Sequence, residues 1–298
     1  MTKKNDHLTE ELKKIVPDLK LKEPLAKHTT FHLEGEADFF AQIANIEQLQ
    51  KVLEIIEGKI PIFILGAGSN VLVTEKGWPG IVIRLTGEFN KLTITDREIT
   101  VGAGMSLPLF LNKLAEAGLE GLEFLAGIPG TAGGAIAMNA GLKKEWIGQY
   151  VEALEIIDFS GQRKVLAQKD LNFAYRQSNL EGKIALSAKF RLKKNRKDVI
   201  IQNIQKYLAM RRETQPQGGG RMGSIFKNPP GDFAGRLIEA AGFKGCRLGG
   251  IKVSEKHANF LINEGAGKAK DFLNLVKKIR AAVKKKFGVN LDLEIKIL

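Results

Sequence analysis

The most informative segment of the chain reads Gly127-Ile-Pro-Gly-Thr-Ala-Gly-Gly-Ala-Ile-Ala-Met-Asn-Ala-Gly141. It holds five of the 32 glycines in fifteen residues, with one proline and no charged side chain. Glycine leaves the backbone unrestrained and weakens helices and strands, so we expect neither here. Ile128, Ile136 and Met138 supply apolar anchors that a flexible linker lacks. The pattern predicts a packed loop whose bare N–H groups meet a ligand such as phosphate. An isolated cluster would instead indicate tight turns in a buried corner.

Two further glycine turns follow short apolar runs. Residues 60–65 lead into Gly66-Ala67-Gly68-Ser69-Asn70, and another short strand leads into Gly102-Ala-Gly104. An apolar, β-branched run ending in Gly-x-Gly is typical of a strand that feeds a phosphate-binding turn. The dinucleotide fingerprint is absent because Val71 stands where its third glycine belongs, and no Gly-Lys-Ser/Thr of a P-loop follows. Three such turns together indicate a large phosphate-bearing cofactor that lies across several loops.

The bulk properties are those of an intracellular enzyme. At 298 residues the chain is long enough for two or three domains. Its first residues lack the apolar stretch of a signal peptide, and no run approaches the roughly 20 apolar residues that cross a bilayer. We therefore expect a cytoplasmic protein without membrane insertion. Cys246 and the four histidines show no metal-ligand spacing, so we predict no metal.

The formal net charge of +13 raises the alternative of a nucleic-acid-binding protein. Much of this charge lies between Gly267 and Gly288, where eight Lys or Arg accompany one Asp. Apolar residues recur there at helical spacing, which makes the lysines the solvated face of an amphipathic helix. No aromatic-basic interleaving is present, so we expect no nucleic acid. A basic enzyme that attracts polyanionic substrates explains the charge at least as well.

Helices and strands alternate without a regular βαβ cadence, which indicates an α+β fold rather than a doubly wound sheet. Helices are expected at 8–16, 46–57, 107–117, 197–212, 233–241 and 268–287, with Ser106 and Asp232 as N-caps. Strands are expected at 61–65, 81–85, 92–94, 99–101, 151–159, 164–166, 184–192, 258–262 and 289–298. Strict alternation in the last strand predicts that Glu294 points away from its apolar face. Alternation alone fits a solvated edge carboxylate equally well.

Two polar segments carry candidate chemistry. Tyr175-Arg176-Gln177-Ser178 places an arginine beside an aromatic ring, and Gly223-Ser224 begins a segment that continues through Lys227-Asn228. Each has a plain structural alternative, a stacked surface arginine in the first and a turn serine in the second. No Gly-x-Ser-x-Gly elbow surrounds Ser224, which argues against an acyl-transfer nucleophile.

Six segments, taken in order, resemble the UDP-N-acetylenolpyruvoylglucosamine reductase family, also called UDP-N-acetylmuramate dehydrogenases. The segments are Lys27-His28-Thr29-Thr30-Phe31, Leu65 to Asn70, Gly127 to Gly141, Tyr175 to Ser178, Gly223-Ser224-Ile225-Phe226-Lys227-Asn228-Pro229, and Val253 to Ala258. The resemblance runs from about Pro24 to the end of the sequence. No single segment is specific, but six in the family's order are.

The resemblance implies NADPH-dependent, FAD-mediated reduction of UDP-N-acetylglucosamine enolpyruvate to UDP-N-acetylmuramate in peptidoglycan precursor synthesis. Hydride reaches C3 of the enolpyruvyl group through the flavin, and a protein acid protonates C2. In this scheme Ser224 donates the proton, Arg176 binds the substrate carboxylate, and Glu294 completes the catalytic site.

The resemblance also assigns the binding residues. Substrate contacts are expected from Tyr175, Lys227 and Asn228. FAD contacts are expected from Gly66, Ala67, Gly68, Ser69, Asn70, Gly130, Thr131, Gly133, Gly134 and Asn139. Neither Cys246 nor any histidine lies in the glycine turns, so we expect the FAD to be noncovalent.

The implied architecture is an FAD-binding fold of the vanillyl-alcohol-oxidase (PCMH) type in two subdomains, followed by an α+β substrate-binding domain. The expected boundaries are 1–88 and 89–196 for the FAD-binding subdomains and 197–289 for the substrate-binding domain. Residues 290–298 form a last strand that carries Glu294. We expect a monomer.

The chain departs from the family pattern at two places. The family often has a lysine just before the proline ahead of the serine loop, but Thr214-Gln215-Pro216 has none; Arg221 is a candidate substitute, and the sequence leaves the replacement open. The segment between Ser178 and Lys183 is short, so the tyrosine-bearing insertion of one branch is absent and the chain resembles the shorter branch. The rival enzyme class is another FAD oxidoreductase of the same fold that acts on a sugar or hydroxy acid.

Overall fold

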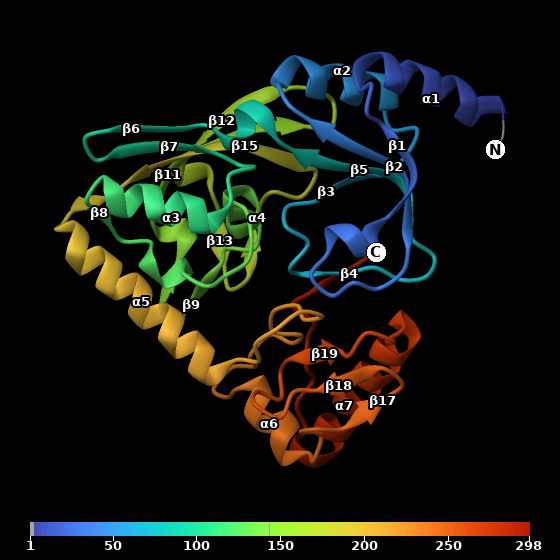
Figure 1. The fold of residues 1–298 in the computed structure, drawn as a ribbon, viewed down its shortest axis with the longest axis vertical. Helices are drawn as coiled ribbons and strands as arrows, with labels where there is room; N and C mark the ends of the chain where they lie inside the picture. The colour runs from blue at the N-terminus through green and yellow to red at the C-terminus, as the bar shows by residue number, and fades with distance from the viewer. Residues whose placement is uncertain (1–2, 143) are drawn as a thin grey trace. The chain divides into compact units, whose positions relative to one another are not determined.

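The computed structural model describes residues 3–142 and 144–298, and the chain divides into two compact units (Figure 1). Unit 1 comprises Met1–Lys22, Asp38–Ala67 and Pro79–Ala209. Unit 2 comprises Glu23–Ala37, Gly68–Trp78 and Met210–Leu298. Each unit is therefore assembled from separate stretches of sequence, and the glycine turn at 66–70 passes from unit 1 to unit 2 after Ala67.

The helices and strands confirm an α+β chain. The helices are α1 (Lys3–Ile15), α2 (Ile46–Ile56), α3 (Leu107–Glu116), α4 (Ala132–Ala137), α5 (Lys197–Thr214), α6 (Ala234–Ala240) and α7 (Ala269–Phe287). The strands are β1 (Lys20–Pro24), β2 (Glu36–Ile43), β3 (Ile62–Ile64), β4 (Val71–Leu72), β5 (Trp78–Leu85), β6 (Leu92–Thr95), β7 (Glu98–Gly102), β8 (Leu119–Glu120), β9 (Gly141–Leu142), β10 (Glu145–Trp146), β11 (Val151–Asp158), β12 (Arg163–Ala167), β13 (Phe173–Ala174), β14 (Gln177–Ser178), β15 (Lys183–Arg191), β16 (Lys193–Lys194), β17 (Arg247–Leu248), β18 (Ile251–Val253), β19 (Leu261–Asn263) and β20 (Lys296–Ile297). None of these described helices is long and apolar enough to span a bilayer.

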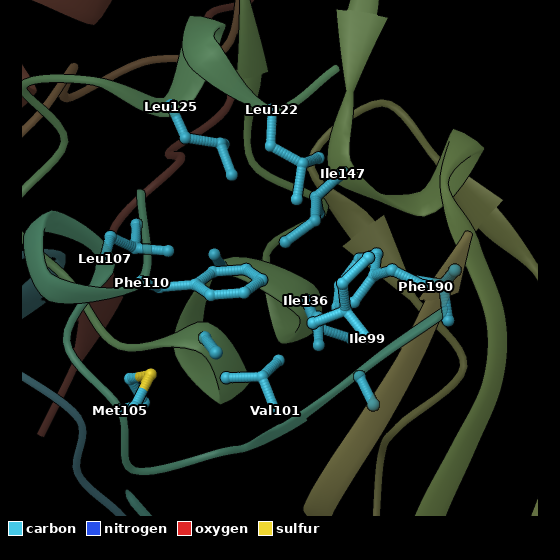
Figure 2. Close-up of a cluster of buried hydrophobic side chains, with 14 of the residues drawn as sticks. Ile99, Val101, Met105, Leu107, Phe110, Leu122, Leu125, Ile136, Ile147 and Phe190 are labelled. Carbon is cyan, nitrogen blue, oxygen red and sulfur yellow. The ribbon is translucent and has the colours of Figure 1, made fainter. Parts of the chain in front are cut away.

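Unit 1 is built on an antiparallel five-stranded sheet in the order β12–β11–β15–β7–β6. The strands predicted at 92–94, 99–101, 151–159 and 164–166 are present and form the hairpins β6–β7 and β11–β12. One face of this sheet is apolar and packs under α3 and α4, where Phe110 of α3 lies 5.9 Å from the Phe190 ring of β15. Figure 2 shows these rings with Val101 of β7 and Ile136 of α4 in the same cluster. The core therefore fixes α4, which belongs to the glycine-rich segment, on the sheet.

A second core of unit 1 surrounds α2 and a four-stranded sheet in the order β1–β2–β5–β3. Strands β3 and β5 run parallel. The turn that begins with Gly66 follows the carboxyl end of β3. Leu49 and Leu53 of α2 are fully buried against the same cluster as Ile81 and Ile83 of β5. The packing of α2 against this sheet thus helps to fix the position of the turn that begins with Gly66.

Unit 2 combines an antiparallel sheet, β17–β18–β19, with α6 and α7. The predicted amphipathic helix is confirmed as α7, because Phe272, Val276 and Ile279 are buried while Lys277 and Arg280 are exposed. The lysine-rich face therefore belongs to an ordinary core-packing helix. The Phe272 ring also meets the Phe31 ring edge-on, with centroids 5.4 Å apart and planes at 80°.

The expectation that 127–141 contains no helix is wrong. Residues 132–137 form α4, which includes Gly133 and Gly134. Tertiary bonds support this short helix, because the Ala132 and Gly133 N–H groups donate to the Met105 and Ala103 carbonyls at 2.8 Å. Glycine lowers helix propensity, but fixed acceptors outside the helix override that weakness.

The predicted last strand is also much shorter than expected. Only β20 forms, parallel to β4, and Leu293 makes a single bridge to Phe226. The backbone of residues 293–296 pairs with two different segments. The Glu294 N–H donates to the Ile225 carbonyl, and the Lys296 N–H donates to the Asn70 carbonyl. Ile297, expected on the apolar face, is 41% exposed. The alternation of apolar residues therefore reflects two successive short pairings rather than one strand.

The helix starts differ from the predicted N-caps in detail. Ser106 does precede α3, but its side chain makes no capping bond. Helix α6 begins at Ala234, whose N–H donates to the Asn228 Oδ1 at 3.0 Å, so Asn228 supplies the cap expected from Asp232. Asp232 instead pairs with Arg236, which lowers the pKa of Asp232 to about 2.

The caps of α2 and α3 give a matched test of helix capping. Asn45→Ala removes the acceptor of the Gln48 N–H, a bond of 2.9 Å, and is expected to lower the free energy of unfolding by about 1 kcal/mol. Ser106→Ala removes no capping bond and is expected to change it by no more than a few tenths of a kcal/mol. Urea denaturation followed by circular dichroism measures both, and equal losses would contradict the assignment.

Candidate active site

The glycine turns predicted from the sequence converge within unit 1. A Cβ placed on Gly66 would lie 2.9 Å from the Thr131 hydroxyl oxygen. That oxygen also accepts a hydrogen bond of 3.2 Å from the Gly134 N–H and so caps α4. Thr131 therefore contacts the first glycine turn and starts the helix of the second.

The third glycine turn, residues 102–106, is hydrogen-bonded to the start of α4 and to the residues just before it. Besides the two bonds that begin α4, the Leu107 N–H donates to the Gly130 carbonyl at 2.9 Å. A Cβ on Gly102 would lie 2.1 Å from the Phe89 carbonyl oxygen, so internal packing requires this glycine. The third turn thus supports the second one.

Glycines 130 and 134 are not explained by the packing of the chain. A Cβ on Gly133 would come within 2.7 Å of the Ala103 Cβ, which excludes a side chain there. Equivalent atoms on Gly130 and Gly134 would meet only ordinary contacts, at 3.5 Å and 3.4 Å, and neither residue has a positive φ. Internal packing therefore does not explain why positions 130 and 134 lack side chains. A ligand that approaches the backbone closely would explain it, because a side chain would block that approach. Unit 1 fits a phosphate-bearing cofactor on this ground.

Tyr175 and Arg176 form the two-residue turn between β13 and β14. Arg176 has a φ of 57°, uncommon for a side-chain-bearing residue and a frequent mark of functional turns. Its guanidinium lies 5.3 Å from the centroid of the Tyr175 ring and donates to the Gly141 carbonyl at 3.0 Å. The turn is thereby tied to the end of the glycine-rich segment.

Two more side chains attach this hairpin to the glycine-rich segment. The Ser178 hydroxyl donates to the Ala137 carbonyl at 2.8 Å, and the Asn139 amide donates to the Ala174 carbonyl at 2.8 Å. Asn139 is only 2% exposed and also accepts from the Gly148 N–H. Its buried amide therefore joins the glycine-rich segment to the hairpin and to Gly148.

In unit 2, Ser224 lies on an irregular segment with backbone partners on either side. The Gly223 N–H donates to the Ser69 carbonyl at 3.2 Å, and the Glu294 N–H donates to the Ile225 carbonyl at 2.9 Å. The Asn70 side-chain amide donates to the Glu294 carbonyl at 3.1 Å. Unit 2 therefore brings Ser224 and Glu294 together with the second half of the first glycine turn.

The remaining predicted residues take places around this segment. Ala67 is exposed, whereas Gly68 is buried with a φ of 65°. A Cβ on Gly68 would lie 2.2 Å from the His28 carbonyl oxygen, so the Lys27–Phe31 segment packs directly on the turn. Lys227 is half-buried and its N–H donates to the Asp292 carbonyl at 2.8 Å. Asn228 is exposed at the surface and caps α6.

The last of the six family-like segments, Val253 to Ala258, also lies in unit 2 and forms a turn. The Ser254 hydroxyl oxygen accepts from the Lys256 and His257 N–H groups, and the Phe260 N–H donates to the His257 carbonyl, so the chain turns through 258–259 and the strand expected from 258 begins only at Leu261. Side-chain acceptors compete with strand pairing in such segments. The turn presents Asn259, which the sequence analysis missed. Its only signal is an asparagine flanked by the apolar Ala258 and Phe260.

The predicted catalytic residues are thus found on both units: Arg176 on unit 1, and Ser224 with Glu294 on unit 2. Arg221, the expected substitute for the missing lysine, donates to the Gly218 carbonyl in its own loop. Among the described residues, no group of three or more His, Cys, Asp or Glu side chains is arranged to hold a metal ion.

Comparison with known proteins first defines the class. Residues 37–166, which contain all three glycine turns, match the model of an FAD binding domain. The structure resembles 6-hydroxy-D-nicotine oxidase from Arthrobacter nicotinovorans with a TM-score of 0.60 over 86% of this chain and 83% of that one; at 12% identity, the likeness concerns the fold. The protein is an FAD-binding oxidoreductase with the α+β fold of the vanillyl-alcohol-oxidase type, which confirms the predicted fold class.

The family follows from closer matches. Residues 215–298 match the C-terminal domain of UDP-N-acetylenolpyruvoylglucosamine reductase. UDP-N-acetylenolpyruvoylglucosamine reductase 2 of Symbiobacterium thermophilum is 40% identical across 97% of this chain and 96% of its own length, and the Moorella thermoacetica reductase is 42% identical across 92% and 91%. The crystal structure of the Thermus caldophilus reductase superposes with a TM-score of 0.81 and 37% identity, covering 94% of this chain and 98% of that one. The chain belongs to the UDP-N-acetylenolpyruvoylglucosamine reductase family.

Positions 133 and 134 separate packing from cofactor binding. Gly134→Leu is expected to fold but to purify without FAD, because a Cβ there meets only an ordinary contact of 3.4 Å within the chain while the side chain would block a cofactor at this backbone. Gly133→Ala is expected to unfold at lower temperature than wild type, because its Cβ would overlap Ala103. Flavin absorbance per chain and thermal melting distinguish the two effects, and a fully yellow Gly134→Leu protein would refute the first expectation.

Proposed function

We propose that this chain catalyses the NADPH-dependent, FAD-mediated reduction of UDP-N-acetylglucosamine enolpyruvate to UDP-N-acetylmuramate, a step in peptidoglycan precursor synthesis. The observation that carries the proposal is the convergence, within unit 1, of Gly66, the glycine turn at 102–106 and the Tyr175–Arg176 hairpin on residues 130–141 of the remaining glycine turn. Family membership specifies the substrate, since the relatives are named as reductases of this enolpyruvyl sugar.

FAD would be held without a covalent bond by backbone groups. The residues proposed to contact it are Gly66, Ala67, Gly68, Ser69, Asn70, Gly130, Thr131, Gly133, Gly134 and Asn139. Bound FAD would supply the redox chemistry, accepting a hydride from NADPH and delivering it to C3 of the enolpyruvyl group. Because glycine N–H groups are unobstructed, they suit phosphate oxygens.

Arg176 is proposed to bind the carboxylate of the enolpyruvyl group. Reduction at C3 places negative charge on C2 and on the carboxylate oxygens, and a guanidinium can meet such charge with two parallel hydrogen bonds. The Gly141 carbonyl and the Tyr175 ring already fix the orientation of this side chain. An orientation set before substrate arrives favours the transition state. Tyr175, Lys227 and Asn228 remain proposed substrate contacts.

Ser224 is proposed to protonate C2, with Glu294 completing the catalytic group. No hydrogen bond within the described part of the chain uses the Ser224 hydroxyl, so its proton is not committed to a neighbouring protein group. A serine hydroxyl is a weak acid and needs neighbours that stabilise its alkoxide or return a proton to it. Glu294 is placed on the adjoining backbone by its bond to the Ile225 carbonyl.

The proposal includes a cytoplasmic monomer that binds no nucleic acid. The lysine-rich surface that raised the nucleic-acid alternative is the outer face of α7. Size-exclusion chromatography with light scattering tests the monomer, and binding to generic DNA and RNA at moderate salt tests the second point.

A coupled assay tests the reaction directly. Beyond the one equivalent that reduces the bound FAD, purified protein should consume NADPH continuously only when UDP-N-acetylglucosamine enolpyruvate is present, and UDP-N-acetylmuramate should appear in equal amount. A yellow protein that ignores this substrate but oxidises a sugar or hydroxy acid would favour the rival flavoenzyme class instead.

Ser224→Ala should separate the two half-reactions. If Ser224 only protonates C2, flavin reduction by NADPH should proceed at a near wild-type rate. Flavin reoxidation by the enolpyruvyl sugar should slow by roughly a hundredfold or more, which is the usual effect of losing a general acid. Stopped-flow absorbance measures both rates, and equal slowing of both would mean that Ser224 has a structural role.

Glu294→Gln and Arg176→Lys should each impair reoxidation while FAD remains bound. Glutamine keeps the shape of Glu294 but removes its titration, and lysine cannot reproduce the paired hydrogen bonds of arginine. Stopped-flow reoxidation of prereduced protein is the measurement for both. Wild-type turnover by Glu294→Gln would show that this carboxylate takes no part in the reaction.

A further inference from the structure

The segment that carries Ser224 has little secondary structure of its own, so its position depends on what holds it. Residues 223–228 contain no helix and only one isolated bridge, from Phe226 to Leu293. Ile225 and Phe226, directly after the serine, are each 1% exposed. Their backbone polar groups are buried with them and must find partners inside unit 2.

Asn259 supplies three of those partners. Its Oδ1 accepts from the Phe226 N–H at 3.0 Å, and its Nδ2 donates to the Phe226 carbonyl at 2.8 Å. Its own carbonyl accepts from the Ile225 N–H at 2.9 Å. A single residue therefore engages both backbone polar groups of Phe226 and the amide of Ile225, in the manner of a neighbouring strand.

The surroundings of Asn259 leave it no other orientation. The residue is 3% exposed, between buried Ala258 and Phe260. Its N–H donates to the His257 Nδ1 at 3.2 Å, so that ring nitrogen carries no proton. Burial lowers the pKa of His257, which keeps the imidazole neutral and able to accept. The turn at Ser254–Lys256 thus fixes His257, and His257 fixes Asn259.

We propose that Asn259 is a positioning residue for the Ser224 proton donor, clamping Phe226 so that the serine hydroxyl is held at one place relative to the substrate. This inference rests on the proposed function of Ser224. The sugar nucleotide need not touch Asn259, because the amide acts through the backbone two residues from the hydroxyl.

Asn263 is a matched control in the same unit. It is also a buried asparagine, 9% exposed, and its amide also joins separate backbone segments. It donates to the Phe31 carbonyl and accepts from the Gly265 and Gly267 N–H groups. None of these atoms belongs to residues 223–228. The two asparagines are thus alike in burial and chemistry and differ in what they support.

The experiment compares Asn259→Ala and Asn263→Ala with wild-type protein loaded with FAD. For Asn259→Ala we expect flavin reduction by NADPH within about twofold of wild type and reoxidation by the enolpyruvyl sugar slowed roughly 10- to 100-fold. We expect the loss in kcat, with the KM for the sugar little changed. Asn263→Ala should reoxidise within about twofold of wild type even if its melting temperature falls as far. Asn259→Ser, which is too short to reach both Phe226 groups, is a milder second variant.

Amide hydrogen exchange gives a reading that does not depend on turnover. The amide of Phe226, whose acceptor is the Asn259 side chain, should exchange about tenfold faster in Asn259→Ala and by a smaller factor in Asn259→Ser, but not in Asn263→Ala. Unchanged exchange there would overturn the clamp, as would equal slowing of reoxidation by both alanine variants. Wild-type protein that fails to reduce the sugar would defeat the proposed function instead, and the exchange result would then decide the clamp alone.

Discussion

The set of backbone bonds between residues 103–107 and residues 130–133 is the constraint on which the cofactor half of the site depends. Those bonds start α4, hold Gly133 against Ala103, and leave Thr131 placed so that its hydroxyl meets both Gly66 and the Gly134 N–H. Each bond is worth only about 1 kcal/mol net, but an unpaired buried group would cost more. Three turns from distant parts of unit 1 are therefore fixed together by partners that none of them has locally.

Unit 2 solves the same problem with side chains. Its strands are short, and much of the backbone near Ser224 lies outside them. Asparagine side chains replace the missing ladders: buried Asn259 pairs with Phe226, buried Asn263 with Phe31 and the following glycine loop, and half-buried Asn70 with Glu294. A primary amide carries both donor and acceptor, so it can stand in for a peptide group of an adjacent strand. Irregular backbone can thereby be held rigidly where chemistry requires an unusual path.

Much of this structure follows from local patterns in the sequence. Helices α2 and α7 and the turn between β6 and β7 follow from patterns among residues close together in the sequence. The spacing of the glycines likewise identified all three glycine turns. Helix α4 could not be predicted, because the acceptors that start it are the carbonyls of Ala103 and Met105. The path of residues 290–298 depends likewise on Asn70 and Ile225, and the role of Asn259 depends on a partner 33 positions earlier. Pairings between distant residues produce no periodic pattern in the sequence. The motif resemblance therefore identified the segments that form the site, but it did not predict the hydrogen bonds between them.

The discontinuity of unit 2 has a consequence for how the chain can be made and divided. Phe31, Leu33 and Leu72 emerge early in synthesis, yet their core partners, such as Phe272 and Leu291, lie two hundred or more residues later. These apolar side chains stay exposed until the last part of the chain is available, a period in which aggregation or chaperone capture competes with folding. For the same reason, cutting at 209 would not isolate unit 1, since the fragment would keep two unpaired pieces of the other core. A clean excision would have to join Lys22 to Asp38 and Ala67 to Pro79.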